Sequence, residues 1–68
     1  MSNGPSARYA AIRRALGFRG WGYRTLGKKA NYSEAAIKRY MAQLRNGVPG
    51  SVAVGEAINA ALGGVIFG

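Results

Sequence analysis

The chain has 68 residues and a formal net charge of +8, from ten basic and two acidic side chains. A chain this short forms one domain and buries only about 60% of its unfolded surface, so self-association is a common source of extra stability. It has no cysteine and no histidine, which excludes disulfides, zinc-finger sites and the general base most often used in catalysis. Its two carboxylates, Glu34 and Glu56, are far apart in the sequence. We therefore expect neither an enzyme nor a bound cofactor, metal or small-molecule substrate.

The basic residues are confined to one part of the chain. All of them lie before position 46: Arg8, Arg13, Arg14, Arg19, Arg24, Lys28, Lys29, Lys38, Arg39 and Arg45. The segment 46–68 carries a single charge, Glu56. This distribution predicts a polyanion-binding first part and an apolar second part that packs or associates. The alternative is that the charge serves solubility alone.

A first helix is predicted over 7–16, after a polar, flexible N-terminus over 1–6. Ser6 is the candidate N-cap and Gly17 the candidate stop. The inward stripe of this helix consists of Ala11, Ile12, Ala15 and Leu16, with Tyr9 at its edge. The outward basic residues are Arg8, Arg13 and Arg14, for which solubility and phosphate binding are equally good explanations.

A second helix is predicted over 23–30. Gly22 is its cap, and Trp21 before the cap is expected to pack on Leu26 as a hydrophobic staple. The inward residues are Leu26, Gly27 and Ala30. Gly27 is small enough to allow close packing of another helix.

The next segment predicts a tight turn into a third helix over 34–45. Asn31 occupies a position where the turn requires a positive φ, which Asn tolerates better than most residues. Tyr32 follows as an apolar turn residue that pairs with Ile37, and Ser33 is the expected N-cap. The apolar stripe of this helix is Ile37, Tyr40, Met41 and Leu44, at i, i+3, i+4 and i+7.

A fourth helix is predicted over 52–62, with Ser51 as its cap and an inner stripe of Val54, Ile58, Ala61 and Leu62. Gly63 and Gly64 end it and leave an apolar tail over 63–68. The tail would be covered by completing the core, by forming a short strand in a dimer, or by packing on a partner's helix. The predicted dimer contacts are Leu62, Val65, Ile66 and Phe67.

The spacing of these residues resembles that of a known family. The pattern comprises Gly20-Trp21-Gly22-Tyr23, Leu26-Gly27, Asn31-Tyr32-Ser33 and Ile37. It is similar to the lambda-repressor-like (Cro/Xre-type) helix-turn-helix proteins of phages and bacteria, including short phage regulators such as the anti-CRISPR-associated repressors. The chain differs from the family pattern at Gly22, Tyr23 and Asn31, where the family has Ser, Gln and Gly.

The resemblance implies an all-α, compact four-helix helix-turn-helix domain over 7–62. It also implies sequence-specific binding of double-stranded DNA by a homodimeric repressor that recognises an inverted repeat, in the cytoplasm of a bacterial cell and associated with the nucleoid. In such proteins the second helix of the motif enters the major groove and the first crosses the backbone.

Carried over position by position, the base-contacting candidates on the third helix are Ser33, Glu34, Ala35, Lys38 and Arg39. Lys38 or Arg39 would pair with guanine, Glu34 with cytosine, and Ala35 with a thymine methyl. An ion pair with Lys38 is the alternative for Glu34. The backbone-contacting candidates are Tyr23, Arg24, Lys28 and Arg45. Three aromatic residues occupy packing positions and are expected in the core rather than stacked on bases: Trp21, Tyr32 and Tyr40.

Two other functions compete with DNA binding. A small phage-encoded inhibitor or effector would use the same scaffold to bind a protein. A cationic membrane-associated protein would use the weakly charged segment 51–68, but a span needs about 20 predominantly apolar residues. Glu56, Asn59 and the Gly63-Gly64 pair disfavour a span, and we expect no membrane partner.

Overall fold

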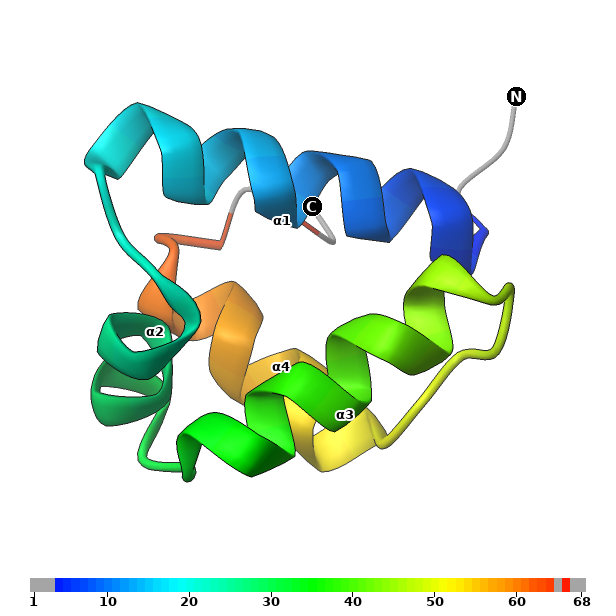
Figure 1. The fold of residues 1–68 in the computed structure, drawn as a ribbon. Helices are drawn as coiled ribbons and strands as arrows, with labels where there is room; N and C mark the ends of the chain where they lie inside the picture. Colours follow the sequence, from blue (N-terminus) through cyan, green and yellow to red (C-terminus); the bar gives the residue numbers. More distant parts are fainter. Residues whose placement is uncertain (1–3, 65, 67–68) are drawn as a thin grey trace.

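The computed structural model describes residues 4–64 and 66. This part of the chain is all-helical, with four α-helices and no strand, as the sequence predicted (Figure 1). The helices are α1 (Pro5–Arg19), α2 (Tyr23–Ala30), α3 (Glu34–Arg45) and α4 (Val52–Ala61).

The helix α1 is longer at both ends than the sequence predicted. Pro5 is its first residue after the Gly4 N-cap, so the predicted Ser6 cap is wrong. Proline suits this position because its φ is already helical and its missing N–H would have had no helical partner. Gly17 lies inside the helix, and Gly20, with φ 70°, takes the left-handed position that ends it. Segment 5–6, expected to belong to a flexible terminus, is therefore helical.

The predicted turn between α2 and α3 is confirmed. Asn31 has φ 66° and ψ 40°, and the Tyr32 N–H donates to the Gly27 carbonyl at 2.8 Å. Ser33 Oγ accepts from the Ala36 N–H at 3.1 Å and caps α3. A Cβ added to Gly27 would lie 2.6 Å from the Tyr32 carbonyl oxygen, so the small residue at this position permits the close approach of the turn to α2.

The helix α4 begins as predicted, because Ser51 Oγ accepts from the Val54 N–H at 3.3 Å. Its last helical residue is Ala61, one before the predicted end, and Leu62 is the C-cap. Gly55 and Ile58 are its buried residues. Gly55 was not part of the predicted stripe.

The core is built from one face of each helix. α2 packs on α3 and on α4, whereas α1 lies across the molecule and packs on α3 (Figure 1). The residues in the core cluster are Ile12, Ala15, Leu16, Leu26, Ala30, Ile37, Tyr40, Met41, Leu44, Ile58 and Leu62. Every predicted inward residue of α2 and the whole predicted stripe of α3 are buried.

Arg19 connects the end of α1 to the end of α4. Its Nη2 donates to the Leu62 carbonyl at 3.2 Å, and its Nη1 donates to the Ala15 carbonyl at 3.4 Å. This side chain therefore holds two helix ends together.

Leu62 is completely buried within its own chain, so the monomer presents no Leu62 surface, and the dimer role predicted for this residue stays a prediction. Ile66 is partly buried against the core, and its N–H donates to Asn59 Oδ1 at 2.9 Å. Ile66 therefore packs within its own chain, as in the alternative in which the tail completes the core. Val65 and Phe67 lie outside the described residues.

None of the helices in the described part of the chain is long and apolar enough to cross a lipid bilayer.

Candidate nucleic-acid interface

The outward face of α3 carries all five residues predicted to contact bases. They are exposed, in contrast to the buried stripe of the same helix, and they are Ser33, Glu34, Ala35, Lys38 and Arg39. Ser33 is also the N-cap, so its hydroxyl already accepts a hydrogen bond. The side chains that remain for base contacts are Glu34, Ala35, Lys38 and Arg39, over the first half of the helix.

Glu34 and Lys38 form an ion pair on this face. Glu34 Oε2 lies 3.4 Å from Lys38 Nζ, and the two side chains are 45% and 62% exposed. A pair this exposed contributes little to stability, on the order of 0–1 kcal/mol. A ligand with better partners for either charge can therefore separate them at small cost.

The helix α2 packs directly on α3, the helix that carries this face. The N-cap of α2, Gly22, provides no side-chain cap for the first backbone N–H groups. Tyr23 is partly buried, whereas Arg24 and Lys28 are exposed. Arg45 is exposed at the far end of α3. Tyr23, Arg24 and Lys28 thus share one helix, and Arg45 lies apart from them.

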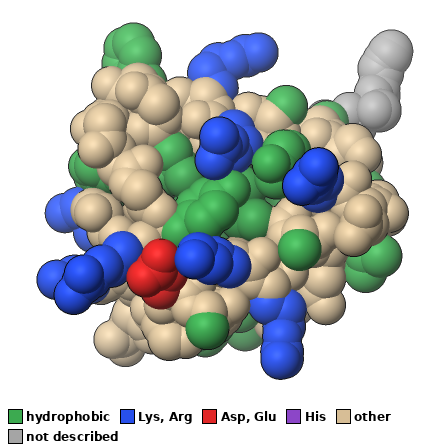
Figure 2. Space-filling model, in the orientation of Figure 1, with side chains coloured by type: hydrophobic (Ala, Val, Ile, Leu, Met, Phe, Trp, Pro, Cys, Tyr) green, Lys and Arg blue, Asp and Glu red, His purple; other side chains and the backbone are tan. Residues whose placement is uncertain are grey.

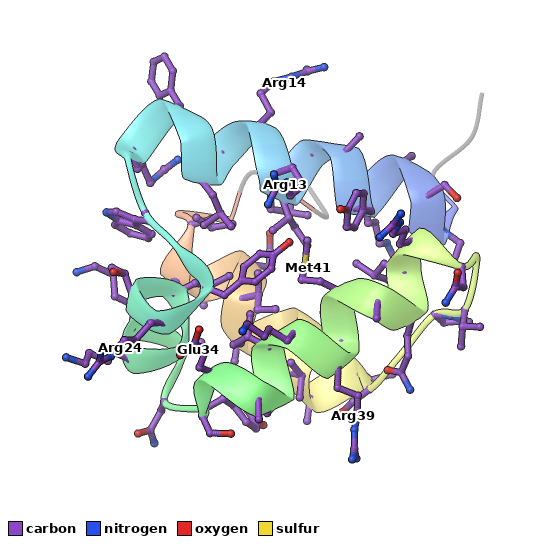
Figure 3. The ribbon with its side chains drawn as sticks, in the orientation of Figure 1. Arg13, Arg14, Arg24, Glu34, Arg39 and Met41 are labelled. Atoms are coloured by element: carbon purple, nitrogen blue, oxygen red, sulfur yellow. The ribbon has the colours of Figure 1, made fainter. Side chains whose placement is uncertain are left out.

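The structure adds Arg13 of α1 to this group. Arg13 Nη1 donates to the Tyr23 hydroxyl at 3.1 Å, and its guanidinium carbon lies 5.7 Å from the centre of the Tyr23 ring. The hydrogen bond to Tyr23 raises the pKa of Arg13 above its ordinary value. In Figure 3, Arg13 lies over the space between α1 and the α2–α3 pair, whereas its neighbour Arg14 points away from α3.

Two basic side chains near α2 are held by an aromatic ring instead. The Trp21 ring lies 5.5 Å from the Arg19 guanidinium carbon and 4.9 Å from Lys29 Nζ. Trp21 is also partly buried against the core, as is Tyr32, and Tyr40 is 2% exposed. The prediction that these three aromatic residues pack rather than lie open for base stacking is confirmed.

The face seen in Figure 2 is basic at its periphery. Lys and Arg side chains lie around an apolar centre, and a small acidic patch lies among them near the start of α3. The described acidic side chains are Glu34 and Glu56, and Glu34 is paired with Lys38. The formal charge of α2 together with the start of α3 is therefore positive.

No protein-family model, no curated protein and no solved structure matches this chain. The function is therefore inferred from the geometry and chemistry of its own residues.

Proposed function

We propose that the protein binds double-stranded DNA sequence-specifically through a lambda-repressor-like helix-turn-helix formed by α2 and α3, as a phage or bacterial transcriptional repressor. The observation that carries the proposal is the pair of helices joined by 31–33. There the left-handed Asn31 and the capped Ser33 present the polar face of α3 to solvent. A short turn between two packed helices, with an exposed second helix, is the arrangement that fits a major groove.

In this proposal α3 enters the major groove at its N-terminal half. Arg39 pairs with a guanine through O6 and N7, and Ala35 contacts a thymine methyl group. Glu34 and Lys38 either remain paired or separate, with Glu34 accepting from cytosine and Lys38 donating to guanine. The weak, exposed ion pair between them makes the second arrangement accessible.

Phosphate contacts come from the start of α2 and from α1. Arg24 and Lys28 are exposed and cationic. Arg13 and Tyr23 act together: the tyrosine hydroxyl accepts from Arg13 and still has its own proton to donate to a phosphate oxygen. Tyr23 occupies the position where the resembling family has Gln, so we propose that the Arg13–Tyr23 pair substitutes for that amide. Arg45 is a flanking contact.

The proposal is tested by comparing the adjacent arginines of α1. Arg13→Ala and Arg14→Ala remove the same charge from one helix, but only Arg13 faces α2 (Figure 3). After selection of a preferred duplex, we expect Arg13→Ala to reduce the magnitude of the log–log salt slope by about 0.9 and Arg14→Ala to leave it nearly unchanged.

A second pair of substitutions separates base contacts from phosphate contacts. Arg39→Ala should cost about 1–3 kcal/mol of binding free energy and relax the preference at one base pair, whereas Arg24→Ala should weaken binding to all sequences alike.

Two results would contradict the proposal. Selection from random duplexes without an enriched motif would exclude sequence-specific binding and favour an effector that uses this scaffold for protein binding. Equal effects of the two α1 substitutions would show that net charge alone, and not the Arg13–Tyr23 geometry, governs association.

A further inference from the structure

A second apolar face runs along α1, away from the candidate DNA interface. Ala11, Ala15 and Phe18 recur at i, i+4 and i+7, which places them on one side of the helix. Ala15 belongs to the core, Ala11 is half-buried, and Phe18 extends this side into solvent. Phe18 is 90% exposed, although most large apolar side chains of the described chain are buried. Together with Ile66 these residues line a groove of about 340 Å³.

The charged residues at the groove are both cationic. Arg14 and Arg19 complete its lining, and no carboxylate belongs to it. Arg19 is engaged by the Leu62 carbonyl and by the Trp21 ring. Arg14 makes no hydrogen bond or ion pair with any residue that the structure describes, and it projects outward in Figure 3. It is therefore the cation available to an incoming group.

We propose that this groove docks an acidic amphipathic helix of a protein partner. Apolar side chains on one face of that helix would pack against Phe18, Ala11 and Ile66, and a carboxylate at the edge of that face would pair with Arg14. An amphipathic helix laid into an apolar groove is a common mode of peptide recognition, and charge complementarity at the rim sets its orientation.

Net charge disfavours a second copy as the occupant. The chain has two acidic side chains against ten basic ones, and Glu34 is already paired with Lys38. Most faces of a second copy would therefore bring cations toward Arg14; the exception is α4, whose single charge is Glu56, and the dimer outcome below tests it. Arg14, which lines the groove, and Arg39 of α3 project from opposite sides of the molecule (Figure 3), so partner binding is compatible with DNA binding and does not depend on it.

The test uses the full chain and three fluorescent synthetic helical peptides. The first has a leucine stripe and otherwise glutamate-rich positions, the second replaces the leucines with alanine, and the third replaces the glutamates with lysine. We expect the first peptide to bind about tenfold or more tightly than the other two by fluorescence anisotropy. Phe18→Ala and Arg14→Glu should each weaken it about tenfold, whereas Arg24→Glu, the matched charge reversal outside the groove, should not. Circular dichroism checks that each variant is folded.

Several outcomes would overturn the proposal. If Arg24→Glu weakens the peptide as much as Arg14→Glu and Phe18→Ala has no effect, the binding is nonspecific attraction to a cationic chain. If the full chain forms a dimer that Phe18→Ala abolishes, the occupant is a second copy. If nuclear Overhauser contacts join the Phe18 ring to residues 65–68 and no peptide binds, the chain's own tail fills the groove.

Discussion

Gly27 lies where the turn after α2 passes closest to that helix. The Tyr32 carbonyl oxygen would be 2.6 Å from a Cβ at this position, and the Ile37 Cγ1 would be 3.4 Å away. The nearest obstacle is backbone, which belongs to the hydrogen-bonded turn and cannot rotate aside. The geometry of the turn thus depends on the absence of a side chain at one residue of the preceding helix.

We expect Gly27→Ala to lower the free energy of unfolding by about 1–3 kcal/mol, the range for overpacking a tightly packed position. Gly17 provides the matched control: it is also helical, and a Cβ there meets nothing within 4 Å. Gly17→Ala should stabilise the protein by about 0.5–1 kcal/mol, because alanine loses less backbone entropy than glycine. Urea unfolding followed by circular dichroism measures both. Equal stabilisation by the two substitutions would contradict the close approach.

Tyr40 makes the stability of the fold decrease at alkaline pH. Burial raises the pKa of its hydroxyl, and nearby Arg8 lowers it in part. In the unfolded chain a tyrosine ionises near pH 10, whereas the buried Tyr40 of the folded chain remains neutral at that pH. The unfolded state therefore holds fewer protons there, and stability is lost as the pH rises from about 10 through the raised pKa.

Tyr40→Phe keeps the ring and removes the titrating hydroxyl. We expect this variant to lose less stability than the natural chain between about pH 9 and 11, as measured by urea unfolding at successive pH values. The two proteins differ only in this hydroxyl, so the difference between the two curves isolates Tyr40. Parallel curves would mean that the Tyr40 hydroxyl ionises freely in the folded protein.

All four helices end with the same pair of hydrogen bonds, one spanning six residues and one four, around a residue with positive φ. The left-handed residues are Gly20, Asn31, Gly47 and Gly63. This C-terminal motif is common where glycine or asparagine follows a helix. Because the signal is local, the sequence predicted the ends of α2 and α3, and it predicted that of α4 to within one residue.

The end of α1 shows where the local signal is insufficient. Gly17 and Gly20 are both candidates for the stop, and a local rule selects the first. The structure uses Gly20, because the Trp21 N–H then reaches the Leu16 carbonyl at 3.0 Å while Trp21 packs against the core. Tertiary packing chooses between two equivalent sequence signals.

In the candidate interface, too, some features follow from local sequence patterns and others depend on tertiary packing. Helical periodicity alone placed the exposed and buried sides of α3, because both follow from spacing along one element. The Arg13–Tyr23 contact joins two helices, so it depends on the angle at which α1 crosses α2, which no local pattern encodes. Likewise, periodicity placed Leu62 in the inner stripe of α4, and this residue is buried in the chain's own core.

At the scale of the whole molecule, the basic residues are separated along the chain from a weakly charged C-terminal part. The ten basic residues lie before position 46, and α4 carries the single charge of Glu56. With Leu62 buried and Ile66 packed on the core, the exposed large apolar residue of α4 is Val52, at 74%. Among the described residues, Val52 is therefore the strongest apolar candidate for self-association through the weakly charged segment.

We expect the protein to act as a dimer on an inverted repeat, because one α3 contacts only a few base pairs and two recognition helices about 34 Å apart share one face of the duplex. Association through α4 would keep the basic surfaces of the two copies apart until DNA neutralises them.

Val52→Asp should then abolish the preference for an inverted repeat over a half-site, since it places a buried charge at the contact. Phe18→Asp, at a still more exposed apolar position outside α4, should preserve that preference. Sedimentation equilibrium and binding titrations with both duplexes measure the effect. A full-length monomer at tens of micromolar that binds the inverted repeat no more tightly than the half-site would rule out the dimer and leave a monomeric DNA-binding domain.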